Sequence, residues 1–169
     1  RVVPPNNEIW YTTSDSKELS KFKVPFFNRL QFGAKIVSNS YGHKKGVIVF
    51  DGNVTCISLN AFNHHTTLKT ISLPESVVDI NGNPFLRCDH LVEFEGELAS
   101  TDGRCLIQDG ELKSFAPLGI TTYVIPQVVN SIDSKAFNER LELNVIYLPE
   151  SIKTIKDNPF SGCLKLSRF

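Results

Sequence analysis

Three glutamates at alternating positions, Glu93, Glu95 and Glu97, have the spacing in this chain that most resembles a catalytic arrangement. Alternate side chains of an extended strand share one face and lie about 6.5–7 Å apart. That separation resembles the carboxylate pair of a glycosidase. The same separation recurs wherever a strand carries Glu-X-Glu, and nothing nearby suggests a sugar subsite. We therefore interpret the three glutamates as a solvated face, with contact to a ligand or cation as the alternative.

Metal and nucleophile chemistry find less support in the sequence. His64 and His65 are adjacent, but neighbouring side chains usually point in different directions, and no Cys or carboxylate spacing completes a zinc site. The sequence lacks the Gly-X-Ser-X-Gly, His-Glu-X-X-His, phosphate-binding-loop and Gly-X-Gly-X-X-Gly motifs. We therefore expect no enzyme activity, no metal and no cofactor.

The composition limits the remaining classes of protein. The chain has 169 residues, with 18 basic and 18 acidic side chains, and is 41% hydrophobic, so it can form a core and is not a disordered chain. Balanced charge argues against a general nucleic-acid-binding protein. No apolar run approaches the roughly 20 residues of a membrane-spanning helix. Because the chain begins at Arg1 and contains no Met, we expect a processed or trimmed N-terminus.

The 12 phenylalanines reveal an internal repeat. Segments 68–88 and 143–163 share the pattern LxxIxLPxS[VI]xxIxxNPFxxC at every defined position. A weaker copy precedes each of them, and the core phenylalanine recurs at the same interval in both cases, from Phe62 to Phe85 and from Phe137 to Phe160. Such a period is typical of solenoid proteins.

The repeat unit predicts how these residues are positioned. In LxxIxL the apolar residues alternate with polar ones, which indicates a half-buried strand, and the following proline ends it because proline has no N–H to donate. A single unit cannot bury its apolar side chains, so neighbouring units must stack and bury them in layers. We therefore expect adjacent LxxIxL strands to pair in parallel and the four core phenylalanines to form one column.

Two stretches depart from the repeat. Residues 97–117 contain Asp109-Gly110 between alternating apolar runs, a strong hairpin signal. The stretch 9–22 is similar, with Asp15-Ser16 at its turn, and 32–50 also looks extended. We therefore predict an N-terminal β-hairpin or capping region over residues 1–44. A repeat array over 45–169, with a hairpin insert at about 97–117, completes one continuous domain.

A longer unit, a hairpin plus two repeats, also recurs. The interval from Leu68 to Leu143 equals the interval from Leu91 to Leu166. The final residues, 166–169, match the start of a repeat, so we expect the array to be cut within a repeat.

These repeats resemble the BspA-type (Treponema pallidum-type) leucine-rich repeat family of bacterial surface proteins, found in Bacteroidetes. The resemblance rests on the two LxxIxLPxS[VI]xxI…PFxxC copies, the copies around Phe62 and Phe137, and residues 99–107. It implies a mainly β, right-handed leucine-rich-repeat solenoid of 23-residue units, with a parallel sheet, short helical turns and inserted β-hairpins. It also implies a secreted or cell-surface protein for adhesion or protein contact. His65 and Arg140 replace the Cys of the pattern, so no functional residue of the family is carried over.

The four cysteines raise the question of disulfides. Cys88 and Cys163 occupy equivalent positions three turns apart, roughly 14 Å by strand spacing, whereas a disulfide needs Cα atoms within about 7 Å. Cys56 replaces a polar repeat position and Cys105 lies in the insert. We expect no disulfide, with Cys88 and Cys163 buried as small apolar side chains.

The repeat geometry also predicts a candidate binding face. The outward positions of the LxxIxL strands form one strip, apolar at both ends, with hydroxyls and acids in the middle. The strip comprises Val47, Val49, Thr70, Ser72, Glu93, Glu95, Thr122, Val124, Val145 and Tyr147. Exposed apolar side chains require a reason, so Val124, Val145 and Tyr147 are the best candidates, with cover by another segment as the alternative. Trp10 and Tyr11 are a candidate sugar-stacking platform, although hairpin packing is the favoured interpretation.

We therefore expect a non-catalytic extracellular or cell-surface leucine-rich repeat module that mediates protein binding or adhesion. The alternative is a carbohydrate-binding accessory module of a surface polysaccharide-capture system. The expected ligand is a protein or a glycan, with no nucleic acid and no membrane insertion within this chain.

Overall fold

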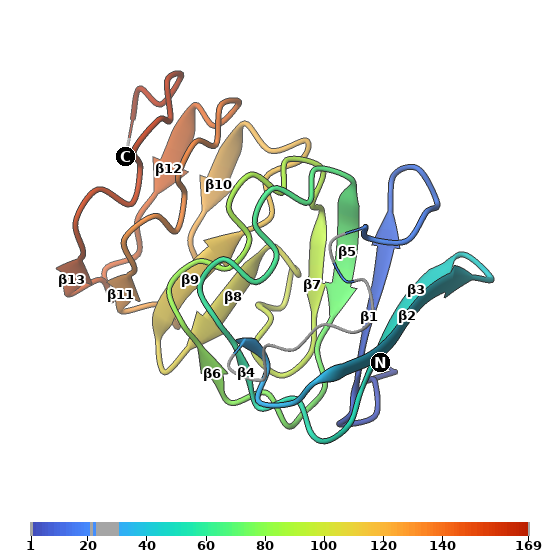
Figure 1. Ribbon diagram of the computed structural model, residues 1–169. Coiled ribbons are helices and arrows are strands. Elements are labelled where there is room, and N and C mark those ends of the chain that lie inside the picture. Colours follow the sequence, from blue (N-terminus) through green and yellow to red (C-terminus); the bar gives the residue numbers. More distant parts are fainter. Residues whose placement is uncertain (1, 21, 23–30, 169) are drawn as a thin grey trace.

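The computed structural model describes residues 2–20, 22 and 31–168. Residues 1, 21 and 23–30, which belong to the predicted N-terminal region, and Phe169, which ends the last partial repeat, lie outside the described residues. Within the described part, β-strands are joined by turns and no α-helix forms. The chain is a mainly β solenoid whose coils lie side by side (Figure 1).

A regular repeat contributes a first strand from LxxIxL and then a two-residue second strand, whereas the repeat that carries the hairpin insert lacks a two-residue second strand. The first strands are β3 (Lys45–Phe50), β5 (Leu68–Ser72), β7 (Glu93–Glu95), β10 (Thr122–Val124) and β12 (Val145–Tyr147). The second strands are β4 (Cys56–Ile57), β6 (Asp79–Ile80), β11 (Ser131–Ile132) and β13 (Thr154–Ile155). The pairs β5–β7, β10–β12, β4–β6 and β11–β13 are all parallel, and the paired residues are one repeat period apart in the chain, as predicted.

The turn segments that carry the core phenylalanines stack behind the strands. The Phe62 and Phe85 rings are parallel, with centroids 5.1 Å apart, and Phe137 and Phe160 repeat this packing at 5.2 Å. In both pairs the backbone N–H of the first phenylalanine donates to the carbonyl of the proline in the next coil (2.9 Å). Proline at this position still offers a carbonyl, so it joins the coils even though it has no N–H.

The four phenylalanines do not form one column, so that part of the prediction is wrong. The core divides into two clusters, one around Phe62 and Phe85 and one around Phe137. The hairpin insert causes the division, because its Phe115 packs on Phe137 (5.0 Å) and supplies the neighbour that a regular repeat would provide.

The insert forms the predicted hairpin from β8 (Cys105–Gln108) and β9 (Glu111–Phe115). Asp109 and Gly110 both have positive φ, as a tight two-residue hairpin turn requires. β9 then pairs in parallel with β11, so the second strands continue into the insert in the order β13-β11-β9-β8.

The N-terminal strand occupies a position that the repeat pattern did not predict. β1 (Glu8–Thr13) lies antiparallel between β3 and β5, and β2 (Ile36–Gly42) pairs with the other side of β3. The resulting sheet has the order β2-β3-β1-β5-β7, whereas β10 and β12, the equivalents of β3 and β5 in the second half of the chain, pair directly. The expected continuous parallel sheet is therefore wrong in the first half of the solenoid.

Burial explains why β1 stays in this position. Ile9, Tyr11 and Thr13 are buried on its inner side. The Tyr11 hydroxyl donates to Asn39 Oδ1 (2.6 Å) and accepts a bond from the Leu19 backbone N–H (3.2 Å), so this phenol is satisfied inside the core. A turn follows at Asp15-Ser16 as predicted, but 17–19 form no strand, so the N-terminal hairpin is replaced by pairing with β3 and β5.

The close approach of Tyr11 to Gly46 provides a test of the inserted strand. A Cβ added at Gly46 would overlap the Tyr11 ring, whereas a Cβ added at Gly42 would meet nothing within 4 Å. We predict that Gly46→Ala lowers the free energy of unfolding by about 1–3 kcal/mol through overpacking. Gly42→Ala, the matched control on the same hairpin, should change it by less than about 0.5 kcal/mol. Urea denaturation of both variants measures the difference, and equal stability would contradict the position of β1.

Candidate functional site

The predicted binding strip forms two separate patches on the outer side of the sheets. Within the pairs β5–β7 and β10–β12, residues that we expected to be neighbours lie directly opposite one another. Val47 and Val49 on β3 do not lie beside β5 as expected, because β1 lies between the two strands. The β5–β7 patch consists of the pairs Thr70–Glu93 and Ser72–Glu95. The β10–β12 patch consists of the pairs Thr122–Val145 and Val124–Tyr147.

The insert separates the two patches. After β7 the chain folds back, and the Phe94 N–H donates to the carbonyl of Gly103 (2.7 Å), which lies in the loop that leads into β8. This loop occupies the edge of β7 where β10 would otherwise pair, so β10 and β12 form their own sheet. The prediction of one continuous strip is therefore wrong, although the pairing predicted for β5 with β7 and for β10 with β12 is correct.

The two patches differ in exposure. In the β10–β12 patch, Val124 is 65% and Tyr147 is 52% exposed. In the β5–β7 patch Ser72 is only 8% exposed, and Thr70, Glu93 and Glu95 are half-buried. The β10–β12 patch therefore offers the more accessible apolar surface.

Trp10 belongs to the outer face of the five-stranded sheet, between Val47 on β3 and Ser72 on β5. Its indole N–H donates to Glu8 (2.7 Å), and the Lys45 ammonium lies 3.5 Å from the ring centroid. A hollow of about 320 Å³ adjoins the ring. This Trp10 hollow is lined by residues that include Trp10, Thr12, Lys45, Thr70, Ser72 and Glu95.

Sequence reasoning grouped Trp10 with Tyr11 and did not place either on the candidate face. Tyr11 is 1% exposed and points into the core, so the two rings do not form a joint platform. The alternation of polar and apolar residues from Ile9 to Thr13 could have shown that only Trp10 faces outward.

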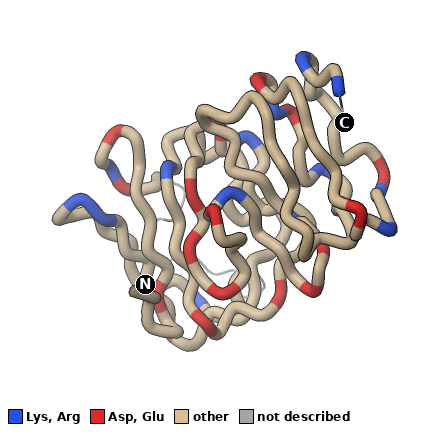
Figure 2. Tube along the Cα trace, turned by 180° about the vertical axis from the view of Figure 1, so that it is seen from behind, with Lys and Arg blue, Asp and Glu red and all other residues tan. Residues whose placement is uncertain are grey.

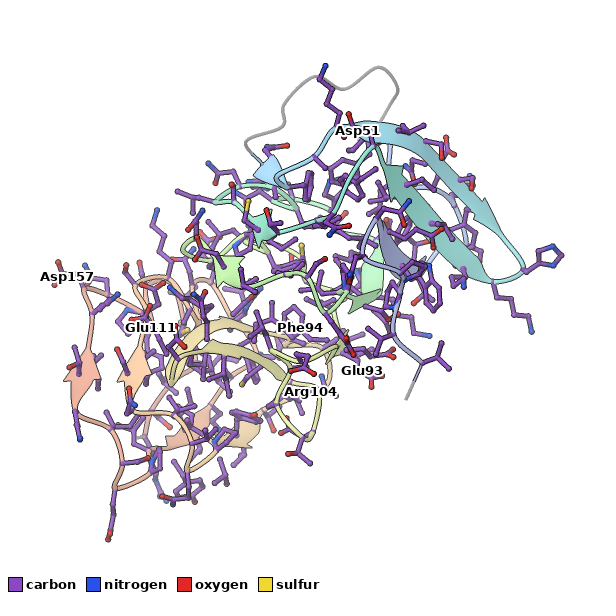
Figure 3. The ribbon with its side chains drawn as sticks, turned by 90° about the horizontal axis from the view of Figure 1, so that it is seen from below. Asp51, Glu93, Phe94, Arg104, Glu111 and Asp157 are labelled. Atoms are coloured by element: carbon purple, nitrogen blue, oxygen red, sulfur yellow. The ribbon has the colours of Figure 1, made fainter. Side chains whose placement is uncertain are left out.

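The three glutamates do not share one strand. Glu93 and Glu95 lie on β7, but Gly96, with φ of +129°, turns the chain before Glu97. The loop that contains Gly103 also lies against the side chain of Glu93. Figure 3 labels Glu93 on β7 and Arg104, which follows Gly103 in this loop. The expected row of evenly spaced carboxylates is therefore wrong at Glu97.

The histidines and cysteines occupy structural positions. His64 is exposed, whereas His65 is buried with its ring stacked on Phe22 at 5.0 Å, so the adjacent rings point in different directions as expected. Among the residues that the structure describes, no group of three His, Cys, Asp or Glu side chains could hold a metal ion. All four cysteines are thiols. Cys88 is buried as expected, but Cys163 is only partly buried.

One position of the repeat turn bonds each coil to the previous one. The Cys88 thiol donates to the Phe62 carbonyl (3.1 Å), and the Cys163 thiol donates to the Phe137 carbonyl (2.9 Å). Arg140 holds the equivalent position and donates from Nη2 to the Phe85 carbonyl (3.3 Å). Burial lowers the pKa of Arg140. Its side chain nevertheless makes the same kind of bond to a phenylalanine carbonyl as the two cysteines. The replacement that seemed to break the cysteine layer therefore preserves its contact.

A polar network fixes the loop before β8. Asp102 accepts bonds from the Ser100 hydroxyl (2.6 Å), the Arg104 N–H (3.0 Å) and the Tyr123 hydroxyl (3.0 Å). Burial alone would raise the pKa of Asp102, but these donors outweigh it and the pKa is lowered. Cys105 lies 3.2 Å from the Tyr123 hydroxyl, and complete burial raises the pKa of its thiol to about 12. This thiol is unsuited to nucleophilic chemistry.

Comparison with known proteins identifies the repeats. Residues 34–106 and 107–169 match the family described as BspA type leucine rich repeat region, in six copies. The chain belongs to this family. BspA-type repeats are associated with bacterial surface proteins and form interaction modules that are typically non-catalytic. Searches of curated proteins and of solved structures gave no match. The described residues contain no helix with the length and apolar character needed to cross a membrane.

The buried Cys105 thiol predicts how stability depends on alkaline pH. The reference thiol ionises near pH 9, whereas Cys105 in the folded chain has a pKa of about 12. Between these values the unfolded chain loses the proton first, so the free energy of unfolding should fall by at most about 1.4 kcal/mol per pH unit. Tyr123, whose pKa burial also raises, adds to this fall as pH increases further.

Urea denaturation between pH 8 and 11 measures this dependence. Cys105→Ala should be less stable at pH 8 because it loses a buried contact, but its stability should fall less steeply with pH. Cys56→Ala, which lies outside the network, should keep the wild-type slope. Equal slopes for all three proteins would contradict the assignment to Cys105.

Proposed function

We propose that this BspA-type chain is a non-catalytic module displayed outside the cell or on its surface, where it mediates adhesion by binding a partner protein. The observation that carries the proposal is the exposed pair Val124 and Tyr147, which lie directly opposite one another on the β10–β12 patch. Family membership supports the interaction role, because its repeats serve chiefly as binding modules.

The β10–β12 patch has the chemistry of a protein contact. Tyrosine is enriched among the residues that dominate binding energy, because its ring buries a large area while its hydroxyl still finds a partner. Thr122 supplies a hydroxyl beside this apolar pair, and Val145 lies opposite it. Acidic and basic residues are interspersed along the coils (Figure 2). This mixed charge is better suited to binding a protein partner than a polyanion.

The alternative function is glycan binding by an accessory module of a polysaccharide-capture system. The Trp10 hollow favours it, because an indole ring with the Thr70 hydroxyl and the Glu95 carboxylate nearby can stack on and bond to a sugar. Two contacts count against it, since Lys45 already covers the ring and Glu8 already accepts its N–H. Protein binding is therefore the better-supported function.

Parallel screens on arrays of surface proteins and of glycans test the proposal. We expect a protein ligand whose affinity falls at least about tenfold in the Val124→Ser, Tyr147→Ala double variant, as for loss of a central aromatic contact. Val78→Ser is the matched control, because Val78 is 67% exposed on another coil, and it should bind like the wild type.

Two outcomes would contradict this assignment. If the double variant bound an identified protein with full affinity, the β10–β12 patch would not be part of the binding interface. Binding to glycans alone, lost in Trp10→Ala and retained in the double variant, would establish the alternative function.

A further inference from the structure

A groove of about 570 Å³ lies where the hairpin insert meets the segment after β10. It is separate from both patches of the predicted strip and from the Trp10 hollow. Its walls come from the loop after β7, from β8 and its turn, and from the segment that leaves β10. The residues that line the groove include Glu97, Leu98, Ile107, Asp109, Pro126 and Val128.

The walls of the groove are held in place by hydrogen bonds. The Ile107 N–H donates to the Leu98 carbonyl, and the Ser100 N–H donates to the Cys105 carbonyl, both at 2.8 Å. Asp102, which also lines the groove, is fixed by the bonds from Ser100 and Tyr123 described above. The groove is therefore formed before any ligand binds, which lowers the entropy cost of binding.

One part of the lining is apolar and accessible. Leu98, Ile107 and Pro126 are half-buried, and Val128 is 65% exposed. Covering such side chains with an apolar group would release about 25 cal/mol for each Å² removed from water. The groove therefore has an apolar subsite for a side chain of its ligand.

The charge of the lining is entirely acidic. Glu97, Asp102 and Asp109 contribute carboxylates, and none of the residues that line the groove is Lys, Arg or His. All three residues are exposed, but the Asp102 carboxylate already accepts hydrogen bonds within the protein. An anionic ligand would be repelled here, and a Lys or Arg side chain would be attracted.

Shape and charge together select one class of ligand. We propose that this groove binds a peptide segment of a partner protein that places an apolar side chain against Ile107 and Val128 and a Lys or Arg beside Glu97 and Asp109. This proposal rests on the proposed protein-binding function and adds a second contact surface, with a stated ligand chemistry. Mixed apolar and charged recognition of this kind gives specificity, because a segment that lacks either feature leaves one part of the groove unmatched.

Selection from a library of random peptides displayed on phage tests the proposal with the full chain. We expect the enriched sequences to combine Lys or Arg with a neighbouring apolar residue. Their affinities, measured by fluorescence anisotropy with the labelled synthetic peptides, should fall as salt is raised, since the charges meet at an accessible surface.

Variants assign the binding to the groove. Glu97→Gln with Asp109→Asn should weaken the selected peptides about tenfold and reduce the salt dependence. Asn tolerates the positive φ of Asp109, so the hairpin turn is retained. Val128→Ser should weaken binding several-fold through lost apolar contact. The matched controls are Glu150→Gln with Asp157→Asn for charge and Val78→Ser for exposed apolar surface, and both should leave affinity unchanged.

The outcomes distinguish this proposal from the proposed function. Enrichment of acidic or uncharged peptides, no enrichment at all, or full affinity in the groove variants would overturn the groove proposal. If the selected peptides instead bind more weakly only to the Val124→Ser, Tyr147→Ala variant, the proposed protein-binding function is supported and the groove proposal is wrong. If the groove variants lose peptide binding but the wild-type chain binds no surface protein on the array, the groove proposal is supported and the proposed adhesion function is wrong.

Discussion

The structure depends on the requirement that each coil satisfies the backbone and apolar groups of its neighbour. Phe62 bonds through its N–H to the Pro84 carbonyl and stacks its ring on Phe85, and the same contacts join Phe137 to the next coil. Between the halves Arg140 donates to the Phe85 carbonyl, as Cys88 and Cys163 donate to phenylalanine carbonyls of earlier coils. Buried polar groups without partners are costly, so this contact persists even where the stacking of phenylalanines is interrupted.

The Trp10 hollow and the groove beside the hairpin insert lie where the regular stack is interrupted, whereas the β10–β12 patch lies on regularly paired coils. Insertion of β1 between β3 and β5 places Trp10 on the outer face and forms the hollow beside it. The loop that pairs with β7 through Gly103 separates the two patches and forms one wall of the acidic groove. The regular coils thus provide stability, and the insertions provide most of the variation in surface shape and charge.

The sequence predicted the features that repeat. The repeat period predicted which residues lie opposite one another, such as Thr70 and Glu93, and Asp109-Gly110 predicted the hairpin. It could not predict the position of β1, because an antiparallel strand that occurs once leaves no periodic signal. It also missed the turn at Gly96, which moves Glu97 off the strand, and the reach of Arg140, because both depend on backbone and side-chain geometry at single positions.

The central structural claim is that β1 lies between β3 and β5, so that these two strands do not pair with each other. Nuclear Overhauser effects between backbone protons test this claim most directly. The arrangement predicts cross-strand effects from Tyr11 to both Gly46 and Ile71, since these residues are its partners on either side. It also predicts no direct effects between Ile48 and Ile71. Strong effects between Ile48 and Ile71, together with none from Tyr11 to either strand, would show a closed parallel sheet and contradict the account.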